Sequence, residues 1–240
     1  MRIDLSSRKV RKESLNHDIA RKYIGGRGLN SERVYREIPS GIDPLGPENK
    51  LMIATGPLVG TMFPTASRFN VSAKSPQTGI FGDSNAGGHF APEMKFAGYD
   101  QIIIEGMAED SSYIFIKDED VQIRSSSQMV YDTVFEADRK IKNDLNDPMV
   151  QTLICGPAAE RGVKISGLFA NQARAASRTG MGAVMASKNL KAVAVRGTGY
   201  VEVADPNAFE DIVLKLEKEI REHEQYPGRR LMGTTRILML

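Results

Sequence analysis

Residues 174–197 read RAASRTGMGAVMASKNLKAVAVRG, and residues 85–106 read NAGGHFAPEMKFAGYDQIIIEG. The two segments share a plan: a loop of small residues, then a short helix that contains Met and Lys, then a β-branched strand closed by Gly106 or Gly197. We interpret the pair as an internal duplication, which predicts a domain with an approximate two-fold axis. The alternative is a chance similarity between two helix–strand units.

Strand patterns outnumber helix patterns along the rest of the chain and come in groups. This grouping predicts an α+β fold with mixed β-sheets and short helices, because a regular βαβ alternation is absent. Residues 101–125 have the pattern of a three-stranded meander. The other expected strands are 1–5, a segment from Val10, 51–58, 67–76, 151–158, 163–170, 191–197 and 200–205. The expected helices are 18–24, 31–37, 131–145 and one that starts at Asp205-Pro206 and is closed by the YPG at 226–228.

The composition excludes several classes of protein. Lys and Arg total 32 against 30 Asp and Glu, so the net charge is only +2, and no nucleic-acid partner is expected. No apolar run approaches the roughly 18 residues of a membrane span, and MRIDLSSRKV lacks the apolar region of a signal peptide. Cys155 is the only cysteine; it lies in an apolar strand pattern and is expected to be a buried, inert thiol. These features predict a cytoplasmic protein with no membrane partner.

Two arginines, Arg174 and Arg178, stand among Ala, Ser, Thr and Gly. Small residues let the backbone approach a ligand closely, and successive main-chain N–H groups in such loops bind anions. If the segment is helical, both arginines lie on one face, and Arg68, after another small-residue stretch, could join them. The residues favour a phosphorylated ligand held between two related loops. Tight backbone packing with solvated arginines remains the alternative, and neither a Walker loop nor a Rossmann fingerprint is present.

Five ordered motifs go beyond this chemistry. They are GPENKLMIATGPLVGT, RFNVSAKSPQTG, SNAGGHFAPEMKFAGYDQIIIEG, CGPAAERGVKISG and RAASRTGMGAVMASKNLKAVAV. Together they closely resemble the N-terminal domain of the aldehyde ferredoxin oxidoreductase family, enzymes with a tungsten (sometimes molybdenum) bis-pterin cofactor. The resemblance implies a cofactor-binding base domain over residues 1–205. Residues 206–240 would begin a second, helical domain, truncated here.

The resemblance also implies site residues. The family's N-terminal domain forms a base of two similar halves, on which two pterins lie, joined through one metal and through a magnesium ion between their phosphates. By position, the residues implied to contact phosphate or pterin are Arg68, Asn85, Ala86, Gly87, Arg174, Ala175, Ser177 and Arg178. The main-chain carbonyls of Asn85 and Ala175 would face Mg²⁺, which prefers oxygen ligands. Ser177 and Thr179 depart from the pattern, since the family usually has Gly at both positions.

Other parts of a full-length family member have no counterpart in these residues. The resemblance implies a [4Fe–4S] cluster with ligands outside this chain, further domains or a separate subunit to carry them, and ferredoxin as electron acceptor for aldehyde oxidation. The chain alone is therefore expected to be inactive, and an uncovered cofactor face would allow a homo-oligomer. His17, His89 and His223 show no metal spacing; His89 is expected to be packed or solvated, with contact to the pterin as an alternative.

Three alternative functions remain open from the sequence. A relative could act on a sugar-phosphate aldehyde or on an aromatic thioester. The chain could be a non-catalytic cofactor carrier, or an unrelated binder of nucleotide phosphates.

Overall fold

The computed structural model describes residues 1–235. The chain forms two compact units: one comprises Met1–Gly60 and Ser67–Val201, and the other comprises Thr61–Ala66 and the residues after Val201. The boundary that the family resemblance implies, between residues 205 and 206, stays a prediction.

The first unit contains two six-stranded sheets. The first sheet has the order β2-β1-β6-β3-β4-β5. Strand β1 is parallel to β6, and every other pair in this sheet is antiparallel. The strands are β1 (Arg2–Asp4), β2 (Lys9–Arg11), β3 (Leu51–Thr55), β4 (Phe69–Lys74), β5 (Phe81–Ala86) and β6 (Gln101–Glu105).

The second sheet repeats this plan with the order β8-β7-β12-β9-β10-β11. Again one pair, β7 with β12, is parallel and the others are antiparallel. Each strand from β1 to β6 thus has its equivalent six strands later in the chain. The strands are β7 (Ser112–Lys117), β8 (Asp120–Ser125), β9 (Gln151–Cys155), β10 (Leu168–Ala170), β11 (Arg174–Ala176) and β12 (Leu190–Arg196).

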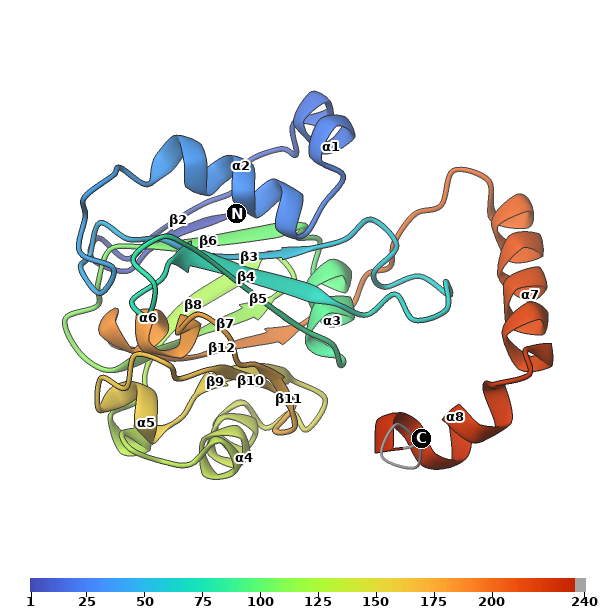
Figure 1. The fold of residues 1–240 in the computed structure, drawn as a ribbon. Coiled ribbons are helices and arrows are strands. Elements are labelled where there is room, and N and C mark those ends of the chain that lie inside the picture. The colour runs from blue at the N-terminus through green and yellow to red at the C-terminus, as the bar shows by residue number, and fades with distance from the viewer. Residues whose placement is uncertain (236–240) are drawn as a thin grey trace. The chain divides into compact units, whose positions relative to one another are not determined.

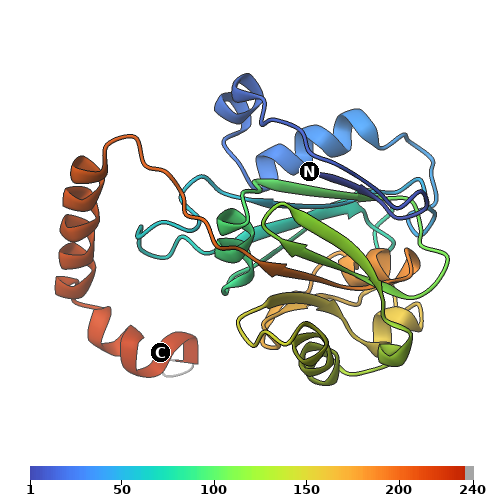
Figure 2. The ribbon, with the colours of Figure 1, turned by 180° about the vertical axis from the view of Figure 1, so that it is seen from behind.

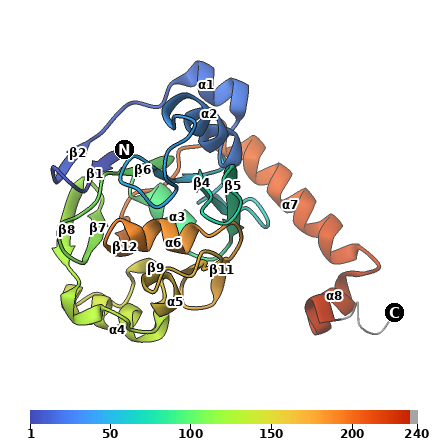
Figure 3. The same ribbon diagram turned by 60° about the vertical axis from the view of Figure 1, so that its left-hand side comes forward.

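Equivalent helices complete the two halves. Helix α2 (Arg27–Glu37) packs on β3 and β4, and α4 (Val134–Leu145) packs on β9, so each covers the outer face of its sheet. Helices α3 (Phe90–Phe96) and α6 (Met181–Ser187) lie between the sheets (Figures 1 and 3). The two stacked sheets are seen from behind in Figure 2. The remaining helices of this unit are α1 (His17–Tyr23), α5 (Pro157–Glu160) and a 3₁₀ turn at Ser127–Met129. This repeated order confirms the predicted α+β fold with two related mixed sheets and an internal two-fold arrangement.

The main core lies between the sheets, where both halves contribute side chains. Ile53 and Leu153 come from the two sheets, while Met94 and Met185 come from α3 and α6; all four are fully buried. A second cluster joins Ala137 and Ile141 of α4 to the outer face of the second sheet. Two clusters that share one sheet make this unit a single layered domain.

The predicted meander at residues 101–125 is wrong. Strand β6 belongs to the first sheet, while β7 and β8 belong to the second. Gly106, with φ +71°, ends β6, and the chain then crosses from one half to the other. The local sequence does not reveal this crossing, because β6 and β7 are both apolar strands separated by a short polar segment, as two paired neighbours would be.

Several predicted boundaries also change. Helix α2 begins at Arg27 instead of Ser31, because Gly26, with φ +48°, makes the turn before it. Strand β3 ends at Thr55, and the expected strand at 163–170 is reduced to β10. Residues 200–205 form no strand. Helix α4 starts at Val134 because Thr133 and Glu136 form a capping box.

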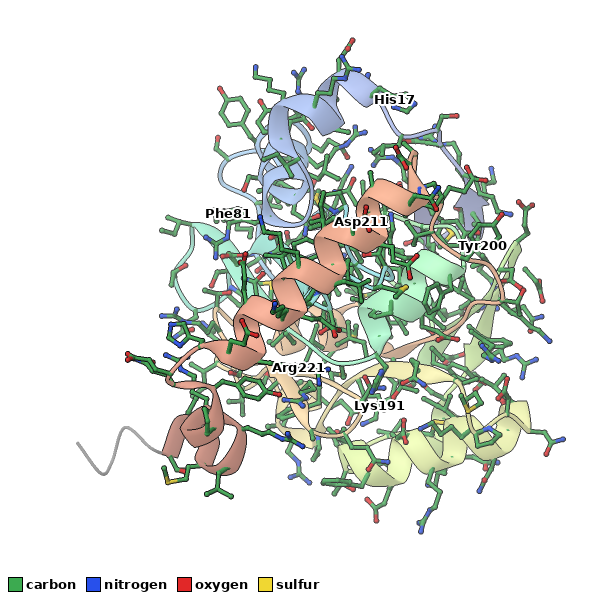
Figure 4. All side chains as sticks on the ribbon, turned by 90° about the vertical axis from the view of Figure 1, so that its right-hand side faces the viewer. His17, Phe81, Lys191, Tyr200, Asp211 and Arg221 are labelled. Carbon is green, nitrogen blue, oxygen red and sulfur yellow. The ribbon has the colours of Figure 1, made fainter. Side chains whose placement is uncertain are left out.

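The second unit contains two helices. Asp205 accepts the N–H of Ala208 and caps α7 (Pro206–Glu222), as the sequence predicts. The tripeptide YPG does not end this helix; it opens α8 (Tyr226–Met232), where Pro227 fits the first turn. Charged side chains such as Asp211 and Arg221 lie along α7 (Figure 4). The second domain expected at 206–240 extends beyond the described residues. Among the described residues, no helix is long and apolar enough to span a membrane.

Candidate functional site

Strands β5 and β11 are each the free edge of their own sheet, and they lie side by side (Figure 1). They do not form a ladder; side chains join the segments instead. The main-chain N–H of His89 donates to Asn171 Oδ1 at 2.9 Å, and the N–H of Arg178 donates to Ser84 Oγ at 3.1 Å. We call residues 83–89 together with 171–179 the seam. Phe81, at the start of β5, is labelled in Figure 4.

The seam lies where the two halves meet as equivalents. Strand β5 of the first half corresponds to β11 of the second, so the approximate two-fold axis that relates the halves passes between these two strands. The opposite edges, β2 and β8, also correspond, but long basic side chains bridge them. Arg8 donates to Ile123 O at 2.6 Å, and Lys12 donates to Glu119 O at 2.8 Å. The seam thus presents two equivalent main-chain edges to a ligand.

The structure places seven of the eight predicted site residues in the seam and the eighth, Arg68, next to it. Asn85 and Ala86 are the last residues of β5, and Gly87 follows; the expected loop at 85–87 is therefore mostly strand. Arg68 directly precedes β4, whose Phe69 pairs with Ala86, so Arg68 lies opposite Gly87.

The second half supplies the other four predicted residues. Arg174 and Ala175 lie in β11, while Ser177 and Arg178 lie in the loop before α6. The condition under which Arg174 and Arg178 would share a helix face is not met, because Arg174–Ala176 pair with β10 as a strand and Arg178 follows in a loop.

Positive charge at the seam is uncompensated. Arg68, Arg174 and Arg178 are exposed, and within residues 1–235 their guanidinium groups form no hydrogen bond or ion pair. Nearby, Arg27 is different, because its Nη2 lies 2.5 Å from Asp83 Oδ2. Guanidinium groups with free donors are suited to carboxylate or phosphate oxygens.

Main-chain carbonyls also point into the seam. Thr179 Oγ1 donates to the carbonyl of Asp83 at 3.3 Å, so that carbonyl faces the free edge of β5. Successive residues of a strand direct their carbonyls to opposite edges, so the Asn85 carbonyl, two residues after Asp83, faces the same edge as the Asp83 carbonyl. In β11 a Cβ built on Gly167 would lie 3.0 Å from the carbonyl oxygen of Ala176, which therefore faces β10. The carbonyl of Ala175 consequently faces the free edge.

Small residues are required at the contact between the halves. A Cβ on Gly88 would lie 3.0 Å from Arg174 Cγ and 3.0 Å from Asn171 Oδ1, and φ at Gly88 is +100°. Any side chain at this position would be strained and would push the two edges apart. Gly88 of the NAGG motif therefore serves close backbone approach.

Sequence reasoning missed the residues that hold the seam together. Asp83, Ser84, Asn171 and Thr179 bridge the halves through the hydrogen bonds described above. Their residue types are common in turns and carry no spacing signal, and β5 was not expected as a strand. Thr179, a β-branched residue with φ +59°, is also an unusual conformation that only the coordinates reveal.

Side-chain metal ligands are absent from the part of the chain that is described. No group of three or more His, Cys, Asp and Glu could hold a metal ion among residues 1–235. Burial raises the pKa of the Cys155 thiol to about 12, so the thiol stays protonated and inert at neutral pH. His89 uses its main chain at the seam, and its side chain is exposed. A metal at the seam would have to meet main-chain oxygens or bring its own ligands.

Comparison with known proteins gives this fold and site a family. The family model described as "Aldehyde ferredoxin oxidoreductase, N-terminal domain" matches residues 1–197. The chain therefore belongs to the aldehyde ferredoxin oxidoreductase family, and it contains the family's N-terminal domain.

Individual relatives agree with this assignment. The chain is 44% identical, over 92% of its length, to the tungsten-containing aldehyde ferredoxin oxidoreductase of Pyrococcus horikoshii. It is 34% identical, over 91% of its length, to the WOR-like subunit of an aliphatic sulfonate oxidoreductase of Pyrococcus furiosus. It spans 37% of the length of each of these two relatives.

A solved structure has the same fold. The active-site complex BamBC of benzoyl coenzyme A reductase, in complex with 1,5-dienoyl-CoA, superposes with a TM-score of 0.91 and 35% sequence identity. The likeness covers 93% of this chain and 34% of that chain. Relatives with different substrates thus share this N-terminal domain.

Proposed function

We propose that this chain is the cofactor-bearing base of a tungsten or molybdenum bis-pterin oxidoreductase that oxidises aldehydes to carboxylic acids. The observation that carries the proposal is the seam. Three uncompensated arginines and two inward-facing carbonyls lie where equivalent edges of a duplicated domain meet. A ligand made of two similar halves, such as two pterins, would contact one of these equivalent edges with each half.

The residues at the seam fit the chemistry of the proposed ligand. Arg68, Arg174 and Arg178 would bind pterin phosphates through charge-assisted hydrogen bonds. The carbonyls of Asn85 and Ala175 would face a Mg²⁺ ion between those phosphates, since this cation prefers oxygen ligands. Ala86, Gly87 and Ser177 would line the ligand with little bulk. Ser177 adds a hydroxyl that could donate to a phosphate oxygen.

The protein's part in the reaction is positioning. When bound, the metal–pterin group supplies two-electron redox chemistry. The arginines fix the phosphate ends of the ligand, and the rigid edges of β5 and β11 set where its reacting centre lies. Because both strands belong to sheets with a fully buried shared core, this position is held without loop rearrangement.

Further parts would complete the enzyme. A relative such as the P. horikoshii protein is much longer than this chain, which spans 37% of it. We propose that additional domains, or a separate subunit, supply the substrate site and the [4Fe–4S] ligands, and that ferredoxin accepts the electrons. Cys155 is buried and cannot serve as a cluster ligand without unfolding β9. The chain alone should show no aldehyde oxidation, so measurable viologen reduction by it would contradict the proposal.

The experiment measures tungsten, molybdenum and oxidised-pterin fluorescence in the purified chain. The double variant Arg174→Ala, Arg178→Ala should lower the cofactor content roughly a hundredfold, because each charged hydrogen bond contributes about 1.5–3 kcal/mol. Arg21→Ala, Arg139→Ala is the matched control, since both side chains are exposed and unpaired among the described residues. Equal cofactor loss in both doubles would contradict a specific role for the seam.

A second candidate keeps the cofactor but changes the substrate. The likeness to a benzoyl coenzyme A reductase complex, at 35% identity, supports a relative that reduces an aromatic thioester. The seam serves either reaction, because it contacts the cofactor and not the substrate. Turnover of an aldehyde against benzoyl-CoA by the complete enzyme would separate the two.

A further inference from the structure

We propose that Asp83 is a positioning residue of the seam, one that ties the Arg178–Thr179 loop of the second half to Asn85 of the first. The inference rests on the proposed function, because Asp83 would hold the phosphate-binding Arg178 and the carbonyl of Asn85 at a fixed separation. Asp83 does this with two parts of the residue, its carboxylate and its main-chain carbonyl.

The carboxylate binds groups of the first half. Oδ2 lies 2.5 Å from Nη2 of Arg27, at the start of α2. Oδ1 accepts a short hydrogen bond from Asn70 Nδ2, in β4. The same Asn70 amide lies 3.3 Å from Asn85 Oδ1, so Asp83 and Asn85 share one donor.

Asn70 is anchored in turn by buried groups. Its side-chain oxygen accepts Nδ2 of Asn30 at 2.7 Å and Oγ of Ser72 at 2.7 Å. Asn30, Asn70 and Ser72 are at most 1% exposed. A buried amide with every partner fixed cannot rotate cheaply, so it defines where Asp83 and Asn85 lie on β5.

The main-chain carbonyl of Asp83 reaches the other half. Thr179 Oγ1 lies 3.3 Å from this carbonyl and 2.7 Å from the carbonyl of Arg178, so its one hydrogen is shared between the two acceptors. The Thr179 carbonyl accepts Ser75 Oγ at 2.8 Å. Thr179 holds φ +59°, a conformation that a β-branched residue keeps only when its surroundings impose it. Arg178 precedes Thr179, so these bonds determine where the arginine leaves the backbone.

Charge gives the Arg27–Asp83 pair a second role. A lone carboxylate two residues from Asn85 would repel a phosphorylated ligand. Arg27, whose side chain is 63% exposed, neutralises it without entering the buried network. Removing Arg27 should therefore weaken anion retention even though no phosphate contact is lost, and adding Asp83→Asn should restore part of it.

The pair contributes little to folding, which keeps the proposal testable. An ion pair with one partner this exposed is screened by water, and neither side chain belongs to an apolar core cluster. Variants at Arg27 and Asp83 should consequently remain folded.

The experiment compares the purified 240-residue chain with Asp83→Ala, Asp83→Asn, Arg27→Ala, and the pair Thr179→Ser and Thr179→Val. The readouts are tungsten and pterin per chain, amide hydrogen exchange at residues 84–88 and 177–180, and melting temperature. Asp83→Ala and Thr179→Val should each lower cofactor content roughly tenfold and speed exchange at 177–180 roughly tenfold. Thr179→Ser keeps the hydroxyl and should behave as the parent chain.

The control is Glu119→Gln, which removes an exposed partner of Lys12 on the far edge. Parent-like exchange at 177–180 in both Asp83→Ala and Thr179→Val would overturn the proposal. If the parent chain holds no pterin, the proposed function fails, yet exchange still decides the role of Asp83. If Asp83→Ala does not fold, Thr179→Val against Thr179→Ser gives the decision.

Discussion

Lys188 offers a sharp test of how the two halves are joined. Its side chain is fully buried at the end of α6, in the second half. Its Nζ donates to the carbonyls of Asn49 and Gly106, both in the first half, the latter at 3.0 Å. Burial lowers the pKa of Lys188 to about 8, although the charge of Glu105 acts in the opposite direction.

The sign and size of the effect follow from this shift. Between pH 8 and 10.5 the unfolded chain holds a proton on Lys188 that the folded chain has lost, so stability rises with pH in this window. Integration from pH 7 to pH 10 gives a gain of about 2–3 kcal/mol for the parent chain. Lys188→Met lacks the titrating group, and leaves two buried carbonyls unpaired at about 1–3 kcal/mol each.

Urea denaturation of both proteins at pH 7, 8, 9 and 10 measures the difference in free energy of unfolding. The difference should grow by about 2–3 kcal/mol toward pH 10, because the parent chain gains stability and the variant does not. Lys188→Arg is a useful companion, because its guanidinium keeps its charge throughout and should show no such gain. A difference that stays constant with pH would refute the reasoning.

Three further outcomes are expected. Gly182→Ala should destabilise the fold by about 3 kcal/mol, because its Cβ would lie 2.4 Å from the carbonyl oxygen of Gly167. Gly156→Ala is the control, since the nearest atom to its Cβ would be 3.6 Å away. Equal melting temperatures of the two variants would contradict this reasoning. The free energy of unfolding of Cys155→Ala, minus that of the parent, should rise by about 2–3 kcal/mol between pH 8 and pH 11. The reason is that the raised thiol pKa makes the folded parent lose stability above pH 9; urea denaturation at both pH values checks this. Glu37→Gln should make the free energy of unfolding less dependent on pH below 4.5. Burial alone would raise the Glu37 pKa, but hydrogen bonds from Arg2 and Lys50 outweigh it and lower the pKa to about 2, so its stabilisation is lost as pH falls below 4.5; an unchanged curve would contradict this.

Local pattern was enough for much of the fold. The apolar stripe of α4, the Asp205 cap of α7 and the β-branched strands β3, β6, β7 and β12 follow from period and capping residues. The helix–strand repeat at 85–106 and 174–197 also indicated the duplication correctly. These two segments belong to a longer repeat, in which the six strands of the first sheet correspond in order to the six strands of the second.

The order in which the strands pair could not be predicted from the local sequence pattern. Strand β6 joins β1 and β3, far from it in the chain, rather than the adjacent β7. The three buried residues of β5 are the small residues Gly82, Ser84 and Ala86, so nothing in its composition predicts a strand. Its hydrogen bonds to β4 make it one.

The amino-acid sequence by itself determined the duplicated plan, the family and which small residues and arginines belong to the proposed cofactor site. Only the tertiary structure decided that β5 and β11 meet, which carbonyls face between them, and that Asp83 and Thr179 hold that meeting point. The reason is physical: periodicity and capping act within one segment, whereas the direction of an edge carbonyl depends on which strand occupies the other edge.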